Sequence, residues 1–310
     1  TRVRSSAASD VYKRQAYESA WLRHYFPAEY LAALLNAQPM GFYEPHVLIG
    51  DAQRHGLAVL PPAVNASGAQ CTVESNTVIR LGLDRVTSVS LDTAKGIAGE
   101  RQANGTFGSL FDFVHRAHLK RDQIEALIKS HAFDEYGLRP RELLWQLGLF
   151  FIPRAPGQNQ LDLPTSQSMV RLAQLNAWEQ LREDYSQLGL STELHPLALL
   201  RTKLPGLPTT QDLWHMKEGT PVTLAGLVVC RQRPSTATGI VFELLEDEVG
   251  LANVVVYSEL YDREREIIRL TPLVKVFGTI QWRGGSVNIL AKHFEEVRSE
   301  VATPGARNFH

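Results

Sequence analysis

The densest run of acidic side chains in this sequence is Glu246-Asp247-Glu248, and adjacent carboxylates have the chemistry to hold magnesium. Sites of that kind usually collect their carboxylates from more than one segment of the chain. This run instead precedes Gly250, at a predicted turn between two strands. We therefore interpret it as a solvated turn.

Histidine and cysteine give no stronger signal for a catalytic or metal site. His115 and His118 have a helical spacing compatible with two zinc ligands, but no Glu, Cys or third His is near them, so we interpret them as an exposed helical face. His195 precedes a proline and is expected to cap or pack the next helix. Cys71 and Cys230 lie outside any CxxC pattern and lack a His partner, which argues against a disulfide framework, a zinc site and a nucleophilic thiol. The sequence thus predicts no catalytic residue and no metal ligand.

Length and composition limit the functions that remain. The 310 residues exceed one typical domain, and 44% hydrophobic residues can form real cores. A formal net charge of −1 excludes a globally basic coat, so any nucleic-acid contact must come from local patches. No apolar run approaches the roughly 20 residues that cross a bilayer, and no signal peptide opens the sequence. We therefore expect a soluble, cytoplasmic protein without a membrane partner.

The first half of the sequence has helical periodicity. Residues 1–15 lack apolar periodicity and are expected to be a non-native or disordered edge. Residues 16–78 predict two helices over 16–36 with Pro27 in the first turn of the second, a short helix over 46–55 ended by Gly56, and a small hairpin over 71–83.

Residues 79–150 contain short amphipathic segments joined by tight turns. Two of these segments, 86–97 and 124–133, predict a tandem helix-hairpin-helix arrangement, in which turn amides and a helix N-terminus can receive a backbone phosphate. A generic helical bundle is the alternative. Residues 151–219 predict a linker over 152–164 and two helices, at 169–188 and 196–200.

From residue 220 the apolar period changes from 3.6 to 2. Strands are predicted at 222–231, 240–246, 251–257, 273–282 and 287–294, with a helix at 261–270 between the third and fourth. This is the element order of an OB-fold, a five-stranded barrel that binds oligonucleotides. Residues 220–297 are assigned to this barrel and 298–310 to a disordered tail. The expected fold class is therefore α+β and multidomain.

Five side chains of the predicted barrel have the chemistry to bind a single strand, because rings stack bases and arginines follow phosphates. They are Arg231, Arg233, Phe242, Trp282 and Arg283. Alternation puts Phe242 on the same face as Leu244, so a core position for this ring stays open. The barrel segment has slightly more acidic than basic residues, which predicts a modest, localised site.

Several stretches resemble the carboxy-terminal part of bacterial C-family DNA polymerases, the replicative alpha-chain family. They are residues 16–36 (AYESAWLRHYFPAEYLAALLN), 60–65 (LPPAVN), 79–86 (IRLGLDRV), 107–113 (FGSLFDF) and 127–137 (LIKSHAFDEYG). Within that family the chain resembles the error-prone, damage-associated branch. The stretches that favour this branch are 36–43 (NAQPMGFY), 190–201 (LSTELHPLALLR) and 231–248 (RQRPSTATGIVFELLEDE).

The resemblance implies that residues 16–78 end the fingers region, that the helix-hairpin-helix region grips duplex DNA and that the OB-fold lies near the single-stranded template. It also implies nucleotidyl transfer by two magnesium ions held by acids of the palm. No Asp-x-Asp pair occurs in this sequence, so we expect the fragment to be inactive alone and to need no cofactor of its own. Magnesium is expected in the full-length polymerase. Expected partners are primer-template DNA, single-stranded template DNA and accessory mutagenesis or replication proteins.

The sequence departs from the family at the hairpins, which usually carry glycines. The first reads Thr87-Ser88-Val89-Ser90 and the second Lys129-Ser130-His131-Ala132. Side chains there restrict positive φ and crowd a phosphate, so the first hairpin either binds DNA poorly or uses its serine hydroxyls. The DNA contacts expected here are Ser88, Ser90, Lys95 and Lys129.

Two other functions stay open. One is another enzyme with helix-hairpin-helix and OB elements, such as an NAD-dependent DNA ligase, although no Lys-x-Asp-Gly motif is present. The other is a non-catalytic OB adaptor that acts through protein contacts.

Overall fold

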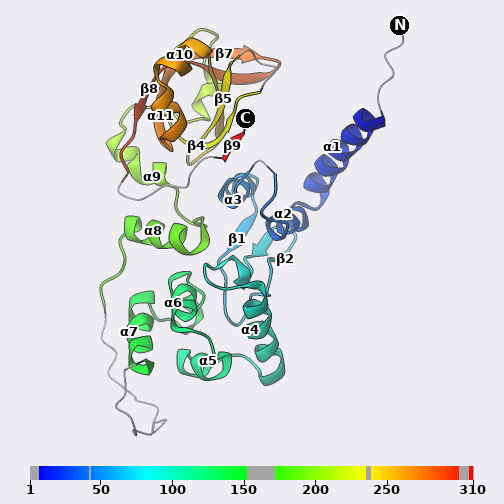
Figure 1. The fold of residues 1–310 in the computed structure, drawn as a ribbon, viewed down its shortest axis with the longest axis vertical. Coiled ribbons are helices and arrows are strands. Elements are labelled where there is room, and N and C mark those ends of the chain that lie inside the picture. The colour runs from blue at the N-terminus through cyan, green and yellow to red at the C-terminus, as the bar shows by residue number, and fades with distance from the viewer. Residues whose placement is uncertain (1–6, 42, 152–171, 235–238, 300–306, 310) are drawn as a thin grey trace.

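The computed structural model describes residues 7–41, 43–151, 172–234, 239–299 and 307–309. The molecule is elongated, with a β-barrel at one end, a group of short helices at the other, and helices α8 and α9 between them (Figure 1). The predicted α+β class is confirmed, because helical segments precede a closed barrel.

The first segment combines three helices with a small sheet. Its helices are α1 (Ala7–Tyr25), α2 (Pro27–Asn36) and α3 (Pro45–Arg54), and its strands are β1 (Ala58–Leu60), β2 (Thr72–Ser75) and β3 (Val78–Arg80). Proline begins α2 and α3, where the missing N–H costs no helical hydrogen bond. The predicted β2–β3 hairpin is present, but β1 was not predicted and pairs in parallel with β3. The order β1-β3-β2 therefore places a strand of only three residues at one edge.

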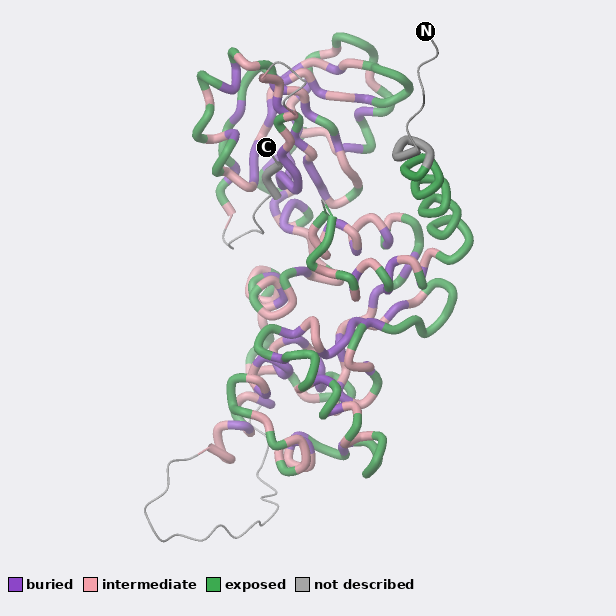
Figure 2. The backbone as a smooth tube through the Cα atoms, turned by 45° about the vertical axis from the view of Figure 1, so that its right-hand side comes forward, coloured by how far each residue is buried: buried purple, intermediate pink, exposed green. Residues whose placement is uncertain are grey.

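The expectation of disorder over residues 1–15 is corrected from Ala7 onward, where helix α1 begins, whereas residues 1–6 lie outside the described residues. Every residue of α1 from Val11 to Tyr25 is exposed, as Figure 2 shows. The sequence offered little sign of this, since a helix without a buried face has no strong apolar periodicity.

The next segment contains short helices around an aromatic core. The elements are η1 (Leu83–Arg85), α4 (Leu91–Asn104), α5 (Leu110–Ala117), α6 (Arg121–Lys129), η2 (Asp134–Tyr136) and α7 (Pro140–Phe150). Phe107, Phe113 and Phe133 are almost fully buried and meet edge to face, at centroid distances of 4.9 and 5.0 Å. Such contacts fix the relative positions of α5 and the turn after α6.

Two helices and two short turns connect this segment to the barrel. They are α8 (Ala177–Leu188), α9 (Pro196–Leu200), η3 (Arg201–Lys203) and η4 (Asp212–His215). Asn176 caps α8 by accepting a hydrogen bond from the Glu179 amide, and Gly189 ends it with φ of 70°, as predicted. The predicted linker at 152–164 lies outside the described residues. The helix expected at 169–188 begins later than predicted, because the described residues 172–176 are not helical and Asn176 caps the helix.

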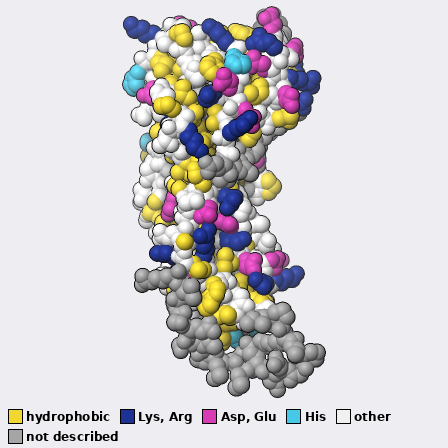
Figure 3. Space-filling view, turned by 90° about the vertical axis from the view of Figure 1, so that its left-hand side faces the viewer, with side chains coloured by type: hydrophobic (Ala, Val, Ile, Leu, Met, Phe, Trp, Pro, Cys, Tyr) yellow, Lys and Arg dark blue, Asp and Glu magenta, His cyan; other side chains and the backbone are white. Residues whose placement is uncertain are grey.

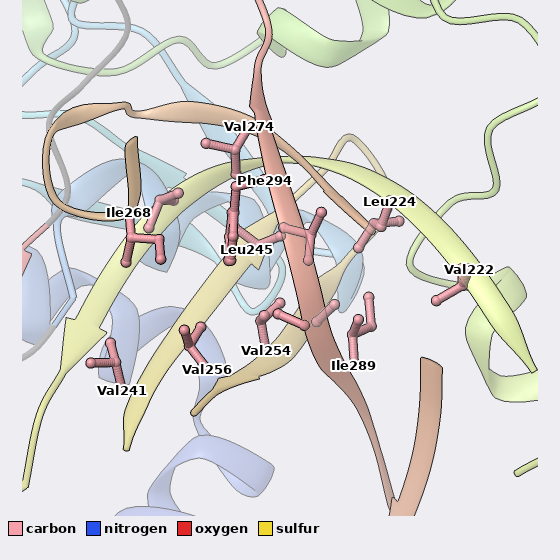
Figure 4. Packing of buried hydrophobic residues seen from close by; sticks show 14 of the residues in the cluster. Val222, Leu224, Val241, Leu245, Val254, Val256, Ile268, Val274, Ile289 and Phe294 are labelled. Carbon is pink, nitrogen blue, oxygen red and sulfur yellow. The ribbon is translucent and has the colours of Figure 1, made fainter. Parts of the chain in front are cut away.

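The barrel closes in the order expected for an OB-fold. Its elements are β4 (Pro221–Gln232), β5 (Val241–Glu246), β6 (Leu251–Val256), α10 (Ser258–Arg263), α11 (Arg265–Leu270), β7 (Leu273–Arg283) and β8 (Ser286–Glu296). The strands pair as β5-β6-β8-β7-β4, and an additional β4–β5 pairing closes the ring. Branched and aromatic side chains fill its interior (Figure 4). Gly278 is required on β7, because a Cβ there would clash with the Leu290 carbonyl oxygen.

The prediction of a disordered tail over 298–310 is corrected for residues 307–309, whereas 300–306 and 310 lie outside the described residues. Residues Arg307–Phe309 form strand β9, which pairs in parallel with Cys230–Gln232 at the end of β4. This end of β4 extends beyond its pairing with β7 and has an open edge, which β9 covers.

Candidate nucleic-acid interface

The first hairpin, residues 86–90, is the turn between η1 and α4. Ser88 has a left-handed backbone with φ of 69°, a conformation that normally favours glycine. Ser90 is the N-cap of α4, and its hydroxyl accepts a hydrogen bond from the Thr93 amide at 3.2 Å. The Ser90 oxygen is therefore already used by the helix, whereas the Ser88 side chain is exposed. The turn has the glycine-type backbone although it contains no glycine.

Backbone amides are the groups that this hairpin leaves available. Among the described residues, neither the Ser88 nor the Ser90 amide has a hydrogen-bond acceptor. Both residues are exposed, at the N-terminus of the 14-residue helix α4, where the helix dipole favours an anion. Lys95 follows one turn later and is also exposed. The arrangement can receive a phosphate through backbone N–H groups and one lysine.

The second hairpin, residues 130–133, follows α6 and also has a left-handed residue, His131, with φ of 67°. The His131 Nδ1 lies 3.0 Å from the Asp134 carboxylate, and this contact raises the pKa of His131. The Lys129 ammonium lies 3.9 Å from Glu183 of α8. Side chains of this hairpin therefore contact neighbouring acids, and Lys129 is half-buried.

Helix α8 packs against both hairpins. The Thr87 amide donates to the Gln187 carbonyl at 2.7 Å, and Gln123 of α6 donates to the Ser88 carbonyl at 3.1 Å. These bonds hold the first hairpin between α6 and the C-terminal end of α8. The second hairpin is close to α8 through Lys129, so α8 positions the two turns relative to each other.

Arg231 was predicted to contact DNA, but it lies inside the protein. Its side chain is 9% exposed, its Nε donates to Glu243 at 3.1 Å, and its guanidinium also donates to the Thr271 carbonyl at 2.5 Å. Burial raises the pKa of Glu243 to about 7, while Arg231 beside it acts in the opposite direction. The prediction for Arg231 is therefore corrected, because this arginine pairs with a buried acid instead of facing solvent.

The other predicted barrel residues are accessible. Arg233 is exposed and stacks over the Tyr261 ring, with 4.6 Å between the guanidinium carbon and the centroid. Phe242 is 38% exposed, so it is not a core residue. Trp282 is 36% exposed, and Arg283 is exposed at the turn that joins β7 to β8. That these residues contact DNA stays a prediction.

Trp214 is an exposed ring that the sequence patterns did not indicate. It lies on η4 and is 52% exposed, and its ring contacts that of Trp282 at a centroid distance of 5.8 Å. No strand or helix pattern marks the residues around Trp214, and the two tryptophans are 68 positions apart in sequence. Its exposure depends on how η4 packs against the barrel, and the sequence carries no local signal for that.

The acidic run is not a solvated turn. Asp247 is fully buried and accepts hydrogen bonds from the Thr210 amide and hydroxyl, both at 2.7 Å, and from the Gly250 amide at 2.9 Å. Arg201 contacts both Asp247 and Glu248. The turn prediction is right for the position between β5 and β6 but wrong for solvation, because cations from other segments cover the acids.

Glu246 joins the barrel to the first segment. Its carboxylate lies 3.1 Å from Nη1 of Arg54 on α3, and the Glu246 side chain is 3% exposed. Burial raises its pKa to about 7, although Arg54 lowers it. Apolar contacts support the same junction, through a cluster of α3, α9 and barrel residues that includes Val47, Leu197 and Leu227.

The remaining candidates have structural positions. His195 caps α9 as predicted, because its Nδ1 accepts from the Leu197 amide at 3.2 Å. His115 is exposed on α5, and His118 is exposed just after that helix with φ of 50°. Cys71 and Cys230 are buried free thiols. No group of three or more potential metal ligands occurs in the part of the chain that the structure describes.

No basic field dominates the surface that Figure 3 shows. Lysine and arginine side chains are scattered among acidic and apolar ones over the barrel and the middle of the molecule. Among the described residues, no helix is both long enough and apolar enough to cross a membrane. Contacts with an anionic ligand therefore depend on local geometry.

The fold and these two surfaces define a class of protein that joins helix-hairpin-helix elements to an OB-type barrel. The family model described as "Helix-hairpin-helix motif" matches residues 56–143. This match includes both hairpins.

Similarity to whole proteins is more specific. Proteins named "Error-prone DNA polymerase" match 97% of the chain with 38% identity in Corynebacterium efficiens and 35% identity in Corynebacterium glutamicum. A protein of the same name from Anaeromyxobacter sp. is 36% identical and matches 95% of the chain. The predicted resemblance is thus confirmed, and the chain belongs to the family of bacterial error-prone DNA polymerases. It spans 27–28% of the length of these relatives.

Solved structures are much less similar. A replication protein A heterotrimer bound to single-stranded DNA covers 27% of the chain with 21% identity and a TM-score of 0.21. An asparaginyl-tRNA synthetase from Pyrococcus horikoshii covers 31% with 18% identity and a TM-score of 0.27. Scores this low support no conclusion about function.

Proposed function

We propose that this chain is the DNA-binding portion of an error-prone DNA-directed DNA polymerase, acting in DNA replication and damage-induced translesion synthesis. One observation carries the proposal. A chain that matches error-prone DNA polymerases over 97% of its length also contains a helix-hairpin-helix motif and a closed OB-type barrel. In this proposal the hairpins hold duplex DNA and the barrel holds the single-stranded template.

The first hairpin supports the duplex contact. Two exposed amides, Ser88 and Ser90, precede a helix whose dipole favours an anion, and Lys95 adds one positive charge nearby. Backbone contacts of this kind fix the position of a protein on DNA without reading its sequence. A polymerase needs such contacts because it must bind every template.

Catalysis is assigned to acids outside this sequence. No Asp-x-Asp pair is present, and the described residues form no group suited to hold two metal ions. Magnesium would therefore be held by the palm of the full-length polymerase, and accessory mutagenesis or replication proteins are proposed partners of that larger protein. A bacterial polymerase of this family would act in the cytoplasm.

Equilibrium binding tests the proposal. Fluorescence anisotropy with a labelled single strand, a duplex and a primed template should show binding to all three that weakens steeply as salt rises. Primer extension by the same chain with magnesium and four nucleotides should be absent. Failure to bind any DNA would favour the adaptor alternative, and extension that survives stringent purification would contradict the assignment of catalysis to another region.

A further inference from the structure

Two tryptophans form an exposed aromatic pair beside the barrel. Trp214 of η4 is 52% exposed and Trp282 at the end of β7 is 36% exposed. Their rings lie at 71° to each other, with centroids 5.8 Å apart. Large aromatic side chains seldom stay exposed together without a ligand or partner, because covering them would gain hydrophobic free energy.

Hydrogen bonds hold Trp282 in place, and a buried neighbour anchors the backbone at Trp214. The Trp282 Nε1 donates to the Met216 carbonyl at 3.0 Å, and the Trp282 amide donates to the Glu218 carboxylate at 2.5 Å. Leu213, next to Trp214, is 1% exposed and belongs to the barrel core. Both rings are therefore anchored to rigid elements, and a ligand that stacks on them loses little entropy to ordering the protein.

A cavity of about 510 Å³ begins at Trp214. Its walls come from three segments: α3 through Arg54, the η4 region through Thr210 and Gln211, and the β5–β6 turn at 248–251. Nη2 of Arg54 is buried and has no hydrogen-bond partner among the described residues. Only Nη2 of Arg54 is unpaired, since Nη1 contacts Glu246, and the Glu248 carboxylate that also lines the cavity is paired with Arg201. A flat ring, an amide and one unpaired guanidinium nitrogen are groups that can hold a nucleobase and its phosphate.

We propose that Trp214 and Trp282 are the platform on which unpaired bases of single-stranded DNA stack, with a neighbouring nucleotide in the cavity toward Arg54. This inference rests on the proposed function and names the site for the single strand. It places the strand at the β5–β6 turn, at the opposite end of β5 from Phe242. The Phe242 end of β5 offers fewer free groups to a ligand, because Arg231 there is buried and Arg233 already stacks on Tyr261.

Anisotropy with a fluorescent oligothymidine and the full 310-residue chain tests the platform. Trp214→Ala should raise the Kd about 5- to 150-fold, the effect expected when one base–ring stack is removed, and should leave the slope of log K against log salt unchanged. Trp214→Phe should keep most of the affinity. Trp145→Ala is the matched control, since Trp145 is 38% exposed on α7, and its Kd should equal that of the parent.

Each other outcome has a definite meaning. If Trp214→Ala binds like the parent while Phe242→Ala binds more weakly, the platform is overturned and the proposed function stands. If the parent chain binds no single strand, the proposed single-strand function fails as well. Quenching of tryptophan fluorescence by the same oligothymidine gives a second readout if the alanine variant does not fold. Quenching should fall more in Trp214→Phe than in Trp145→Phe, and equal quenching would contradict the inference.

Discussion

Two charged side chains of the barrel that were expected at its surface, Arg231 and Asp247, are buried, whereas the polar residues of the first hairpin face solvent. Arg231 pairs with Glu243 below the surface, and Asp247 accepts its hydrogen bonds in full burial. At the first hairpin, by contrast, Ser88, Ser90 and Lys95 are all exposed. Residues of both regions were predicted to contact DNA, but Arg231 instead stabilises the barrel from within.

In the proposed function, this difference separates two modes of binding DNA. The hairpin offers amides and a lysine, which neutralise phosphate and should make binding depend on salt. The barrel offers rings, which stack on bases and release few counterions. Removing the hairpin lysine should therefore change the salt dependence of binding, whereas removing a barrel ring should change the affinity alone.

The largest effect on stability is expected when the buried ion pair between Arg231 and Glu243 is broken. Arg231→Ala should lower the free energy of unfolding by about 3–5 kcal/mol, because it leaves Glu243 buried without its cation. Urea denaturation followed by circular dichroism measures the change. Arg233→Ala is the matched control and should cost less than about 1 kcal/mol, since Arg233 is exposed. Equal small effects would show that Arg231 is a surface residue after all.

The next effect concerns the pH dependence of the Glu246 junction. The pKa of Glu246 is raised to about 7 in the folded chain, with burial as the main cause, so its protonated form is favoured there. Its contribution to stability is complete below its ordinary pKa, near 4.5, and is lost as pH rises through about 7. Relative to Glu246→Gln, the parent should therefore lose on the order of 1–3 kcal/mol between those pH values. Urea titrations at several pH values measure this difference, and parallel curves would contradict it.

Lys95 should change salt dependence rather than stability. Lys95→Ala removes an exposed charge beside the first hairpin, so the slope of log K against log salt for duplex DNA should become shallower by about 0.9. Lys217→Ala is the control, because Lys217 is also exposed but lies next to the barrel. An unchanged slope for Lys95→Ala, measured by anisotropy, would remove this lysine from the duplex contact.

The smallest effect comes from the turn backbone. Ser88→Gly should raise the free energy of unfolding by roughly 0.5 kcal/mol, because relief of the left-handed strain at φ of 69° exceeds the entropy that glycine adds to the unfolded chain. Ser88→Val should lower it by more than this amount. Thermal and urea unfolding of the parent, Ser88→Gly and Ser88→Val measure these differences in stability. A destabilised glycine variant would show that the Ser88 side chain forms a contact that stabilises the fold by more than its backbone strain costs.

Prediction from sequence succeeded where a local pattern is repeated. Each of the five barrel strands was placed to within two residues at either end of the observed element. The burial of β7 and of most of β8 alternates as expected, whereas β4 is buried continuously from Leu224 to Arg231. Pro27 and Gly189 marked a helix start and a helix end correctly. The three-residue strands β1 and β9 were missed, since a segment so short has no measurable period.

Residue roles were harder to predict than elements. Arg231 and Arg233 are two positions apart on or just after the same strand, and only the closure of the barrel buries one and leaves the other exposed. The acidic run at 246–248 looked like solvent-facing charge because its cations, Arg54 and Arg201, are supplied by distant segments.

The sequence by itself determined the order of the barrel strands, the barrel class and the family resemblance, because these depend on local periodicity and on stretches of residues that can be matched directly. Only the tertiary structure decided which charges are internal and which rings are exposed. Trp214 and Trp282 meet because β7 ends beside η4, which precedes the barrel in the chain. Burial and ring contact are properties of surfaces formed by segments that are far apart in sequence, and no local pattern encodes them.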